Sequence, residues 1–182
     1  MIIDKYCIDI LIVFTMNALY IGRFQPFHNG HFNVIKNLSK KYTKIIIGIG
    51  SSQYQDLKDN PFSAEERKLM IDKTLKSTGI ENYEIVFIPD IHDPPNWVDH
   101  VLSVYSDFNI IISNNDFTRE LFAKKGYPVE NTPYFKKDIY SGKVIRRRIE
   151  NNETWIDLVP KQVFKTIVEI DGENRIKRIQ KQ

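Results

Sequence analysis

Residues 18–50, with the sequence ALYIGRFQPFHNGHFNVIKNLSKKYTKIIIGIG, decide the fold class. The apolar run 18–21 predicts a short strand that ends at Gly22, and apolar residues then recur at helical spacing within 30–41. The continuous apolar run 44–50 is typical of a strand buried on both faces of a parallel sheet. Together the three segments predict one βαβ unit.

The alternation of strands and helices continues along the chain. Ser63, followed three residues later by Glu66, predicts a capping box at the start of a helix that Gly79 ends. Further strands are expected at 83–88 and 109–112 with an extended piece at 127–129, and helices at 97–105, 117–125, 142–150 and, as the final helix, 160–170. The pattern predicts an α/β protein with a Rossmann-like, doubly wound parallel sheet, in a single domain with a C-terminal helical segment. Ligands are expected beyond the carboxyl ends of the strands.

Composition limits the classes of function. The 182 residues carry 26 basic and 23 acidic side chains, and a net charge of +3 does not favour a nucleic-acid partner. Cys7 is the sole cysteine, so an internal disulfide is excluded and a reducing cytoplasm is expected. The apolar run 8–14 is far shorter than the roughly 20 residues that span a bilayer, so no membrane partner is expected. We interpret residues 1–15 as an N-terminal extension and residues 16–182 as the domain.

The loop after the first predicted strand carries the chemistry. Gly22 is expected to let the chain turn sharply and its N–H groups approach a phosphate, while the helix that follows presents its positive end. His28 and His31 lie three residues apart at the helix start, so both imidazoles can face one phosphate, and Arg23 adds a guanidinium. Alternatively a histidine here is a polar cap. A zinc pair is disfavoured because no cysteine or third histidine lies nearby.

A second anion site is predicted near the C-terminal part of the chain. Ser141 and the free N–H groups of the helix that it caps can bind a phosphate, and Arg146 lies about one turn further on. Because Arg146, Arg147 and Arg148 are consecutive, they cannot all face one way, and we expect one of them to point inward.

The string 22–31, Gly-Arg-Phe-Gln-Pro-Phe-His-Asn-Gly-His, resembles the His-x-Gly-His nucleotidyltransferases, in particular their archaeal-type nicotinamide-mononucleotide adenylyltransferase branch. The resemblance extends over nearly all of residues 17–178. Further matching segments are 48–53, 60–62 with 66–67, and 140–142 followed by 145–148.

The resemblance implies transfer of AMP from ATP to nicotinamide mononucleotide (NMN), giving NAD and pyrophosphate. It implies His28, His31 and Arg146 as catalytic residues, Mg²⁺ carried by ATP without a resident metal site, and a homo-oligomer, commonly a hexamer. The ATP-binding residues that it implies are Gly22, Arg23, Phe24, Gln25, His28, His31, Ser141, Gly142 and Arg146. The NMN-binding residues are Asp90, Trp97 and Ser51; by spacing alone, Trp97 is equally well explained as a core residue.

The sequence departs from the family pattern at several positions. Pro94 stands where relatives often carry Asn, Lys143 where they carry Thr, Asn114 where they carry Gly, and Gln55-Asp56 where they carry Ser-His. Asn114 can adopt the left-handed conformation that such a Gly allows. Other acceptors therefore stay open, namely flavin mononucleotide, pantetheine phosphate or a cytidylyl transfer, as does a nucleotide-sensing module without catalysis. The basic end with Arg175, Lys177, Arg178 and Lys181 is interpreted as a solvated helix without a ligand.

Overall fold

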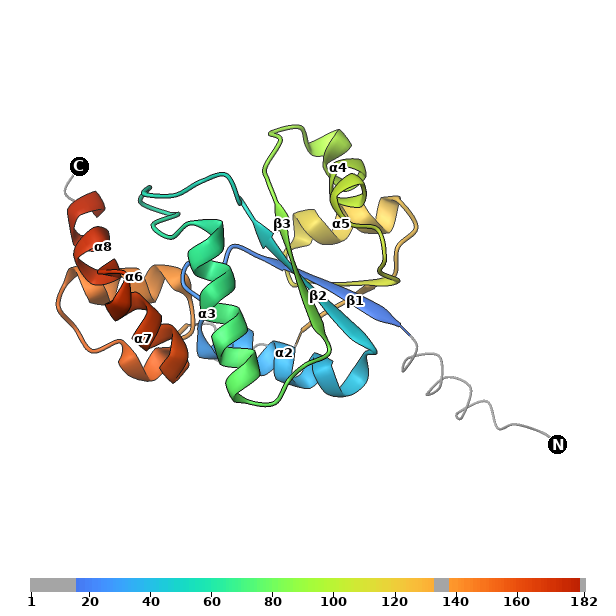
Figure 1. Cartoon of the computed structure of the whole chain (residues 1–182). Helices are drawn as coiled ribbons and strands as arrows, with labels where there is room; N and C mark the ends of the chain where they lie inside the picture. Colours follow the sequence, from blue (N-terminus) through green and yellow to red (C-terminus); the bar gives the residue numbers. More distant parts are fainter. Residues whose placement is uncertain (1–15, 133–137, 181–182) are drawn as a thin grey trace.

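The computed structural model describes residues 16–132 and 138–180, and the predicted extension 1–15 lies outside these residues. It contains a parallel sheet of five strands in the order β3-β2-β1-β4-β5. The strands are β1 (Asn17–Gly22), β2 (Lys44–Gly50), β3 (Tyr83–Ile88), β4 (Ile110–Ile112) and β5 (Val129–Glu130). The predicted doubly wound α/β fold is confirmed (Figure 1).

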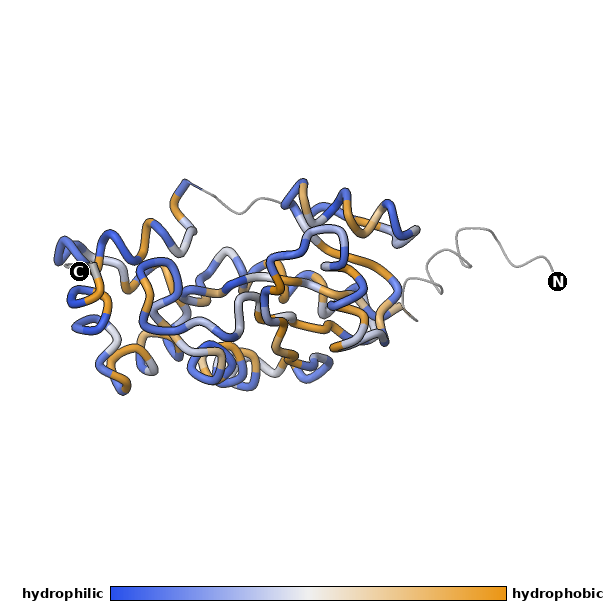
Figure 2. Tube along the Cα trace, turned by 90° about the horizontal axis from the view of Figure 1, so that it is seen from above, coloured by the Kyte–Doolittle hydropathy of each residue, from blue (hydrophilic) through white to orange (hydrophobic). Residues whose placement is uncertain are grey.

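Helices cover both faces of the sheet because the side chains of each strand alternate between two apolar cores. The helices are α2 (Asn29–Lys41), α3 (Ala64–Ser77), α4 (Trp97–Val104), α5 (Asp116–Lys124), α6 (Gly142–Glu150), α7 (Lys161–Glu169) and α8 (Gly172–Gln180). In β2, Ile45 and Ile47 face the core shared with α2 and α3, whereas Ile46 faces the core shared with α4 and α5. Figure 2 shows apolar residues along the strands and polar residues on the outer sides of the helices.

The helix boundaries follow local signals in the sequence. Ser63 accepts a hydrogen bond from Glu66 N, and the Glu66 side chain accepts one from Ser63 N, which is the predicted capping box. Gly79 and Gly126 follow α3 and α5 with φ angles of +72° and +83°, a conformation that glycine adopts without strain. No helix in residues 16–132 and 138–180 is long and apolar enough to cross a membrane.

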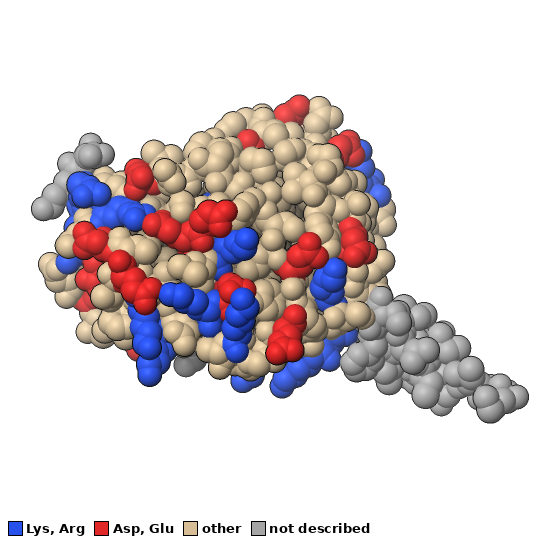
Figure 3. All heavy atoms as spheres, viewed as in Figure 1, with Lys and Arg blue, Asp and Glu red and all other residues tan. Residues whose placement is uncertain are grey.

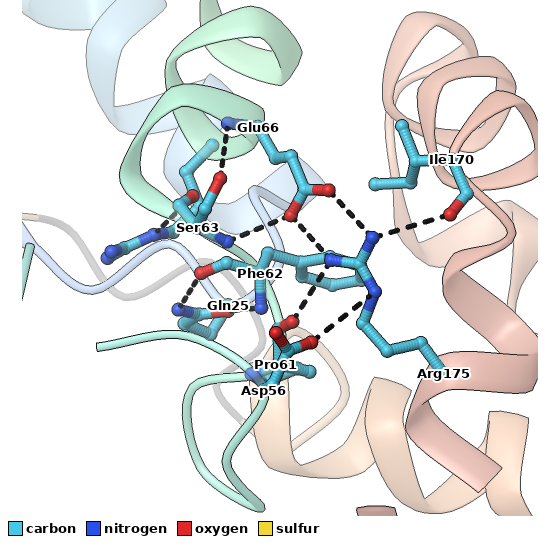
Figure 4. Close-up of polar contacts among 9 residues, drawn as sticks. Gln25, Asp56, Pro61, Phe62, Ser63, Glu66, Ile170 and Arg175 are labelled. Carbon is cyan, nitrogen blue, oxygen red and sulfur yellow. Dashed lines mark hydrogen bonds and ion pairs between the residues drawn. The ribbon is translucent and has the colours of Figure 1, made fainter. Parts of the chain in front are cut away.

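The C-terminal region differs from the expectation of a final helix at 160–170 and a solvated basic end. After α7 the chain turns at Asp171 and forms α8, whose Ile176 is buried in the core. Arg175 is mostly buried as well, and it forms two ion-paired hydrogen bonds with Glu66 of α3, at 2.6 and 2.8 Å (Figure 4). The interpretation of Arg175 as solvated was therefore wrong, because periodicity does not show which charged residue meets a partner distant in sequence.

The order of the strands places the ligand site. From β1 the chain proceeds outward through β2 to β3, and it then returns to the other side of β1 to form β4 and β5. Such a reversal separates the loops that follow the two adjacent strands, so a crevice opens beyond their carboxyl ends. In this protein the crevice lies between the loops after β1 and β4.

Candidate active site

A cleft of about 830 Å³ lies at this crevice. It is lined by the loop after β1, by Asn114 and Asn115 after β4, by Thr132 after β5 and by the start of α6. Of the nine predicted ATP-binding residues, eight line this cleft: Arg23, Phe24, Gln25, His28, His31, Ser141, Gly142 and Arg146. The two segments identified separately in the sequence thus meet at one cavity.

Gly22, the ninth residue, does not line the cleft and does not make the expected sharp turn. The left-handed residue of the loop is Phe24, with a φ of +51°. Gly22 lies under the ring of Phe24, where a Cβ would come within 2.8 Å of a ring carbon. The glycine is therefore needed for close packing of the loop against its own aromatic residue rather than for a turn.

His28 and His31 form a stacked pair at the start of α2. Their ring centroids are 3.5 Å apart with an interplanar angle of 17°. His31 N donates to His28 Nδ1 at 3.3 Å, and His28 N donates to His31 Nδ1 at 3.4 Å, so each imidazole caps the helix. Because both Nδ1 atoms accept hydrogen bonds, the proton of each neutral ring lies on Nε2. Each histidine therefore offers one N–H donor.

Burial keeps both imidazoles neutral at pH 7. His28 is 6% exposed, and its desolvation lowers its pKa to about 4. Burial, with a further contribution from nearby His28, lowers the pKa of His31 well below its usual range. The cap interpretation is confirmed, and because the capping nitrogen is Nδ1, the Nε2 of each ring stays available for the predicted ligand.

Arg146 is the arginine of α6 that points inward. It is 7% exposed, whereas Arg147 is exposed. Its guanidinium donates to Gln25 O at 2.8 Å and forms an ion pair with Asp59 at 2.6 Å. Burial lowers the pKa of Arg146, the Asp59 carboxylate opposes this effect, and the positive charge of Arg23 adds to it.

The cleft is electropositive. The cationic side chains that line it are Arg23, Lys58, Lys143 and Arg146, and Asp59 is the single carboxylate among the lining residues that the structure describes. On the face shown in Figure 3, Lys and Arg side chains are interspersed with Asp and Glu, so the charge balance of the cleft differs from that of this surface. Sequence reasoning missed Asp59, since a single acidic residue in a polar loop carries no pattern.

The loop after β1 lies close to the loop before α3, to which Gln25 binds, and to the start of α6, where Gly142 permits the approach. The Gln25 amide donates to Phe62 O at 2.8 Å and accepts from Phe62 N at 3.0 Å, so this side chain is committed to the loop before α3 (Figure 4). At Gly142, a Cβ would lie 2.5 Å from Gln25 O. The helix α6 can therefore approach the loop only because residue 142 has no side chain.

The predicted NMN-binding residues lie outside the lining of this cleft. Ser51 directly follows β2, and its hydroxyl donates to Asp90 Oδ2 at 2.7 Å, so two of the three residues are in contact. Trp97 begins α4, where its ring packs edge-on against Phe122 with centroids 5.7 Å apart. These contacts bury Trp97 only in part and do not place it beside Ser51 or Asp90, so its role as an NMN-binding residue stays a prediction.

Two of the departures from the family pattern have structural explanations. Asn114 does not take a left-handed conformation; its amide instead donates to Thr132 O and accepts from Thr132 N, both at 2.9 Å, which joins the ends of β4 and β5. Asp56 has a φ of +53° and lies 3.7 Å from Arg175. The acidic residue thus belongs to the contact with α8.

The fold and the cleft define a doubly wound α/β protein with a cationic cleft at the topological switch point of its sheet. Comparison with known proteins agrees with this class: the family model described as cytidylyltransferase-like matches residues 19–148. A nicotinamide-nucleotide adenylyltransferase from Methanococcus aeolicus is 48% identical over 90% of this chain and 95% of its own. Proteins of the same name from Methanolobus tindarius and Thermoplasma volcanium are 42% and 41% identical, over 90% and 89% of this chain and 94% and 91% of theirs. The chain therefore belongs to the nicotinamide-nucleotide adenylyltransferases of the cytidylyltransferase-like family.

Solved structures agree on the fold. A bifunctional NMN adenylyltransferase/ADP-ribose pyrophosphatase from Francisella tularensis, crystallised with AMP and a manganese ion, has a TM-score of 0.75 at 22% identity. The match covers 90% of this chain and 52% of that chain, so this protein spans about half of the bifunctional one. A putative nicotinate-nucleotide adenylyltransferase from Vibrio parahaemolyticus has a TM-score of 0.63 at 15% identity, over 88% and 96% of the two chains.

Proposed function

We propose that this protein transfers the AMP part of ATP to NMN, giving NAD and pyrophosphate, and that ATP binds in the cleft beyond β1. The observation that carries the proposal is the meeting of the His28–His31 pair with the start of α6 and Arg146 in one cavity. Relatives that are 41–48% identical over most of their length bear the name of this activity.

The reaction requires alignment of two anions more than acid–base catalysis. An oxygen of the NMN 5′-phosphate attacks the α-phosphorus of ATP, a new P–O bond forms, and the bond to the β-phosphate bridging oxygen breaks as pyrophosphate leaves. The attacking oxygen is already anionic at neutral pH, so it needs no general base. The protein must hold the two phosphates in line and stabilise the charge on the phosphoryl oxygens.

The residues of the cleft divide this task by their charge. His28 and His31 are neutral N–H donors fixed by their own backbone hydrogen bonds, and such preorganised donors stabilise charge without reorganising during the reaction. Arg146 and Arg23 supply positive charge, and Ser141 is placed at the positive end of α6. ATP must compete with Asp59 for Arg146, since the carboxylate binds one of its nitrogens.

We propose that the reaction uses Mg²⁺ that arrives with ATP. In residues 16–132 and 138–180, no group of three or more His, Cys, Asp or Glu side chains is arranged to hold a metal ion. Mg²⁺ typically keeps several waters and binds substrate phosphates with one or two carboxylates. MgATP is accordingly the form of the substrate in this proposal.

We propose that NMN, the acceptor, binds at the contact between Ser51 and Asp90, and that Trp97 contacts its nicotinamide ring. Ser51 and Asp90 follow the adjacent strands β2 and β3, so both lie at the carboxyl edge of the sheet, as the ATP cleft does. Cytoplasmic location and assembly into a homo-oligomer such as a hexamer are further proposals. Light scattering of the purified protein measures the number of subunits.

The test is pyrophosphate release from MgATP and from MgCTP with each of four acceptors: NMN, its deamido form, flavin mononucleotide and pantetheine phosphate. We expect turnover with MgATP and NMN, with NAD as the product. Turnover confined to an acceptor without a pyridine ring, or tight ATP binding without any product, would show that the proposed reaction is wrong.

A further inference from the structure

Arg67 is a buried arginine whose contacts join the two proposed halves of the active site. It lies in the first turn of α3 and is 0% exposed, and among the residues that the structure describes it is the largest side chain that is fully buried. It does not line the cleft, so it does not touch ATP there. A fully buried guanidinium outside the cleft calls for an explanation, because desolvating a charge is costly unless hydrogen bonds compensate.

The hydrogen bonds of Arg67 end on backbone carbonyls of three different segments. Nε donates to Ser63 O at 3.1 Å, within the cap of α3. Nη1 donates to Arg23 O at 2.9 Å and to Gly50 O at 2.8 Å, and Nη2 donates to Ser51 O at 3.2 Å. One rigid planar group thus fixes the loop after β1 relative to the loop after β2.

These two loops carry the proposed subsites. Arg23 begins the loop that lines the ATP cleft, and Ser51 is bonded to Asp90 on the acceptor side. Both loops bend through left-handed residues, Phe24 at a φ of +51° and Ser51 at +50°, a conformation that costs free energy outside glycine and persists where neighbouring contacts hold it. Arg67 bonds to the carbonyl immediately before Phe24 and to that of Ser51 itself.

The charges around Arg67 indicate that it does more than fill space in the core. Burial and the nearby charge of Arg23 lower the pKa of Arg67 to about 10, and the Asp90 carboxylate opposes this effect. At neutral pH the group remains charged, between a cation of the ATP side and a carboxylate of the acceptor side. An apolar residue could fill the same volume at lower desolvation cost, but it could not bind four carbonyls in fixed directions.

We propose that Arg67 is a positioning residue that sets the spacing between the ATP loop and the acceptor loop, and thereby the in-line approach of the two phosphates. The proposal rests on the proposed function. If the spacing is the role of Arg67, its loss lowers the turnover of the two bound substrates far more than the binding of either one, since a displacement of about 1 Å can cost about 100-fold in rate.

The test variant is Arg67→Lys, which keeps the charge but cannot hold three segments with a planar fork. The matched control is Thr74→Val in the same helix, where a side chain that is 1% exposed loses a hydrogen bond to Met70 O without touching either loop. Melting temperature, the Kd of MgATP and of NMN measured separately, and kcat are determined for each. We expect Arg67→Lys to lower kcat at least about 10-fold while each Kd changes less than about 3-fold, and Thr74→Val to keep kcat. An unchanged kcat in Arg67→Lys, or a fall matched by weaker binding of both substrates, overturns the proposal.

Hydrogen exchange separates this proposal from the proposed function. In Arg67→Lys, and in Arg67→Met as a second variant, amide exchange at residues 22–24 and 50–52 should rise above that of Thr74→Val, whether or not the protein makes NAD. If the wild type forms no NAD, the proposed reaction fails, yet the exchange result still decides the role of Arg67. Exchange equal to that of Thr74→Val in both segments contradicts the role.

Discussion

The buried imidazole of His28 makes a quantitative prediction about acid stability. Burial lowers its pKa to about 4 in the folded protein, whereas an accessible histidine has an ordinary pKa of 6.5. Between these values the unfolded chain binds a proton that the folded protein does not, so stability is complete above about pH 6.5 and falls as the pH falls. The variant His28→Asn removes the titration and keeps a good helix cap.

The size of the effect follows from the two pKa values. Between pH 7 and pH 5 the free energy of unfolding should fall by about 2 kcal/mol through His28 alone. Below this range the carboxyl groups with lowered pKa, such as Glu66 and Glu130, begin to lose their ion pairs as well and would obscure the result. The window of pH 5 to 7 therefore isolates the histidines.

Urea unfolding of the wild type and of His28→Asn at several pH values in this window measures the effect. The difference in stability between the two proteins should change by about 2 kcal/mol in favour of the variant as the pH falls from 7 to 5. His31 contributes to both curves and largely cancels from the difference. Parallel curves would show that His28 is not buried as a neutral ring, and the account of two neutral Nε2–H donors would be wrong.

Three further substitutions test single contacts of the site and its support. Asp59→Asn should lower the KM for ATP by a factor of about 2 to 5, because Arg146 loses a competing carboxylate that is itself 68% exposed. The control Asp56→Asn, in the same loop, should leave this KM unchanged, and an unchanged KM in both variants refutes the competition. Gly142→Ala should reduce the free energy of unfolding, measured in urea, by about 1–3 kcal/mol, because the new methyl would lie 2.5 Å from Gln25 O. The control is Gly50→Ala, whose methyl meets nothing nearer than 3.7 Å, and equal losses of stability in the two variants refute the close approach. Arg175→Gln should lower the free energy of unfolding by about 1–2 kcal/mol, because the ion pair with Glu66 is lost, whereas Arg178→Gln at an exposed residue should change it little. Equal melting temperatures of the two variants would contradict the conclusion that Arg175 fastens α8 to α3.

The fold could be predicted from the sequence because its elements depend on local patterns. The run of apolar residues in 44–50 and the Ser63–Glu66 box specify β2 and the start of α3 without knowledge of any distant contact. The cleft could be predicted in part for a related reason. The carboxyl ends of adjacent parallel strands meet at one edge, so the loop at 22–31 was expected there.

The remaining features depend on contacts between segments far apart in sequence. Arg175 meets Glu66 across 109 residues, and Arg146 meets Asp59 across 87, and neither pair has a periodic signal. The left-handed residue of the loop is Phe24 rather than Gly22, and Gly22 makes room for the Phe24 ring; both facts depend on how this one ring packs. The same holds for Arg67, which matched a family segment in the sequence but had no assignable role until its four carbonyl partners were known.

The rate of NAD formation by His31→Ala, measured with saturating MgATP and NMN, tests the central claim most directly. If the Nε2–H of this residue stabilises the phosphoryl charge, the variant should keep its circular dichroism spectrum at the assay temperature and lose about 100- to 1000-fold in kcat. A variant that turns over within about 3-fold of the wild type would contradict the assignment of this cleft to the reaction.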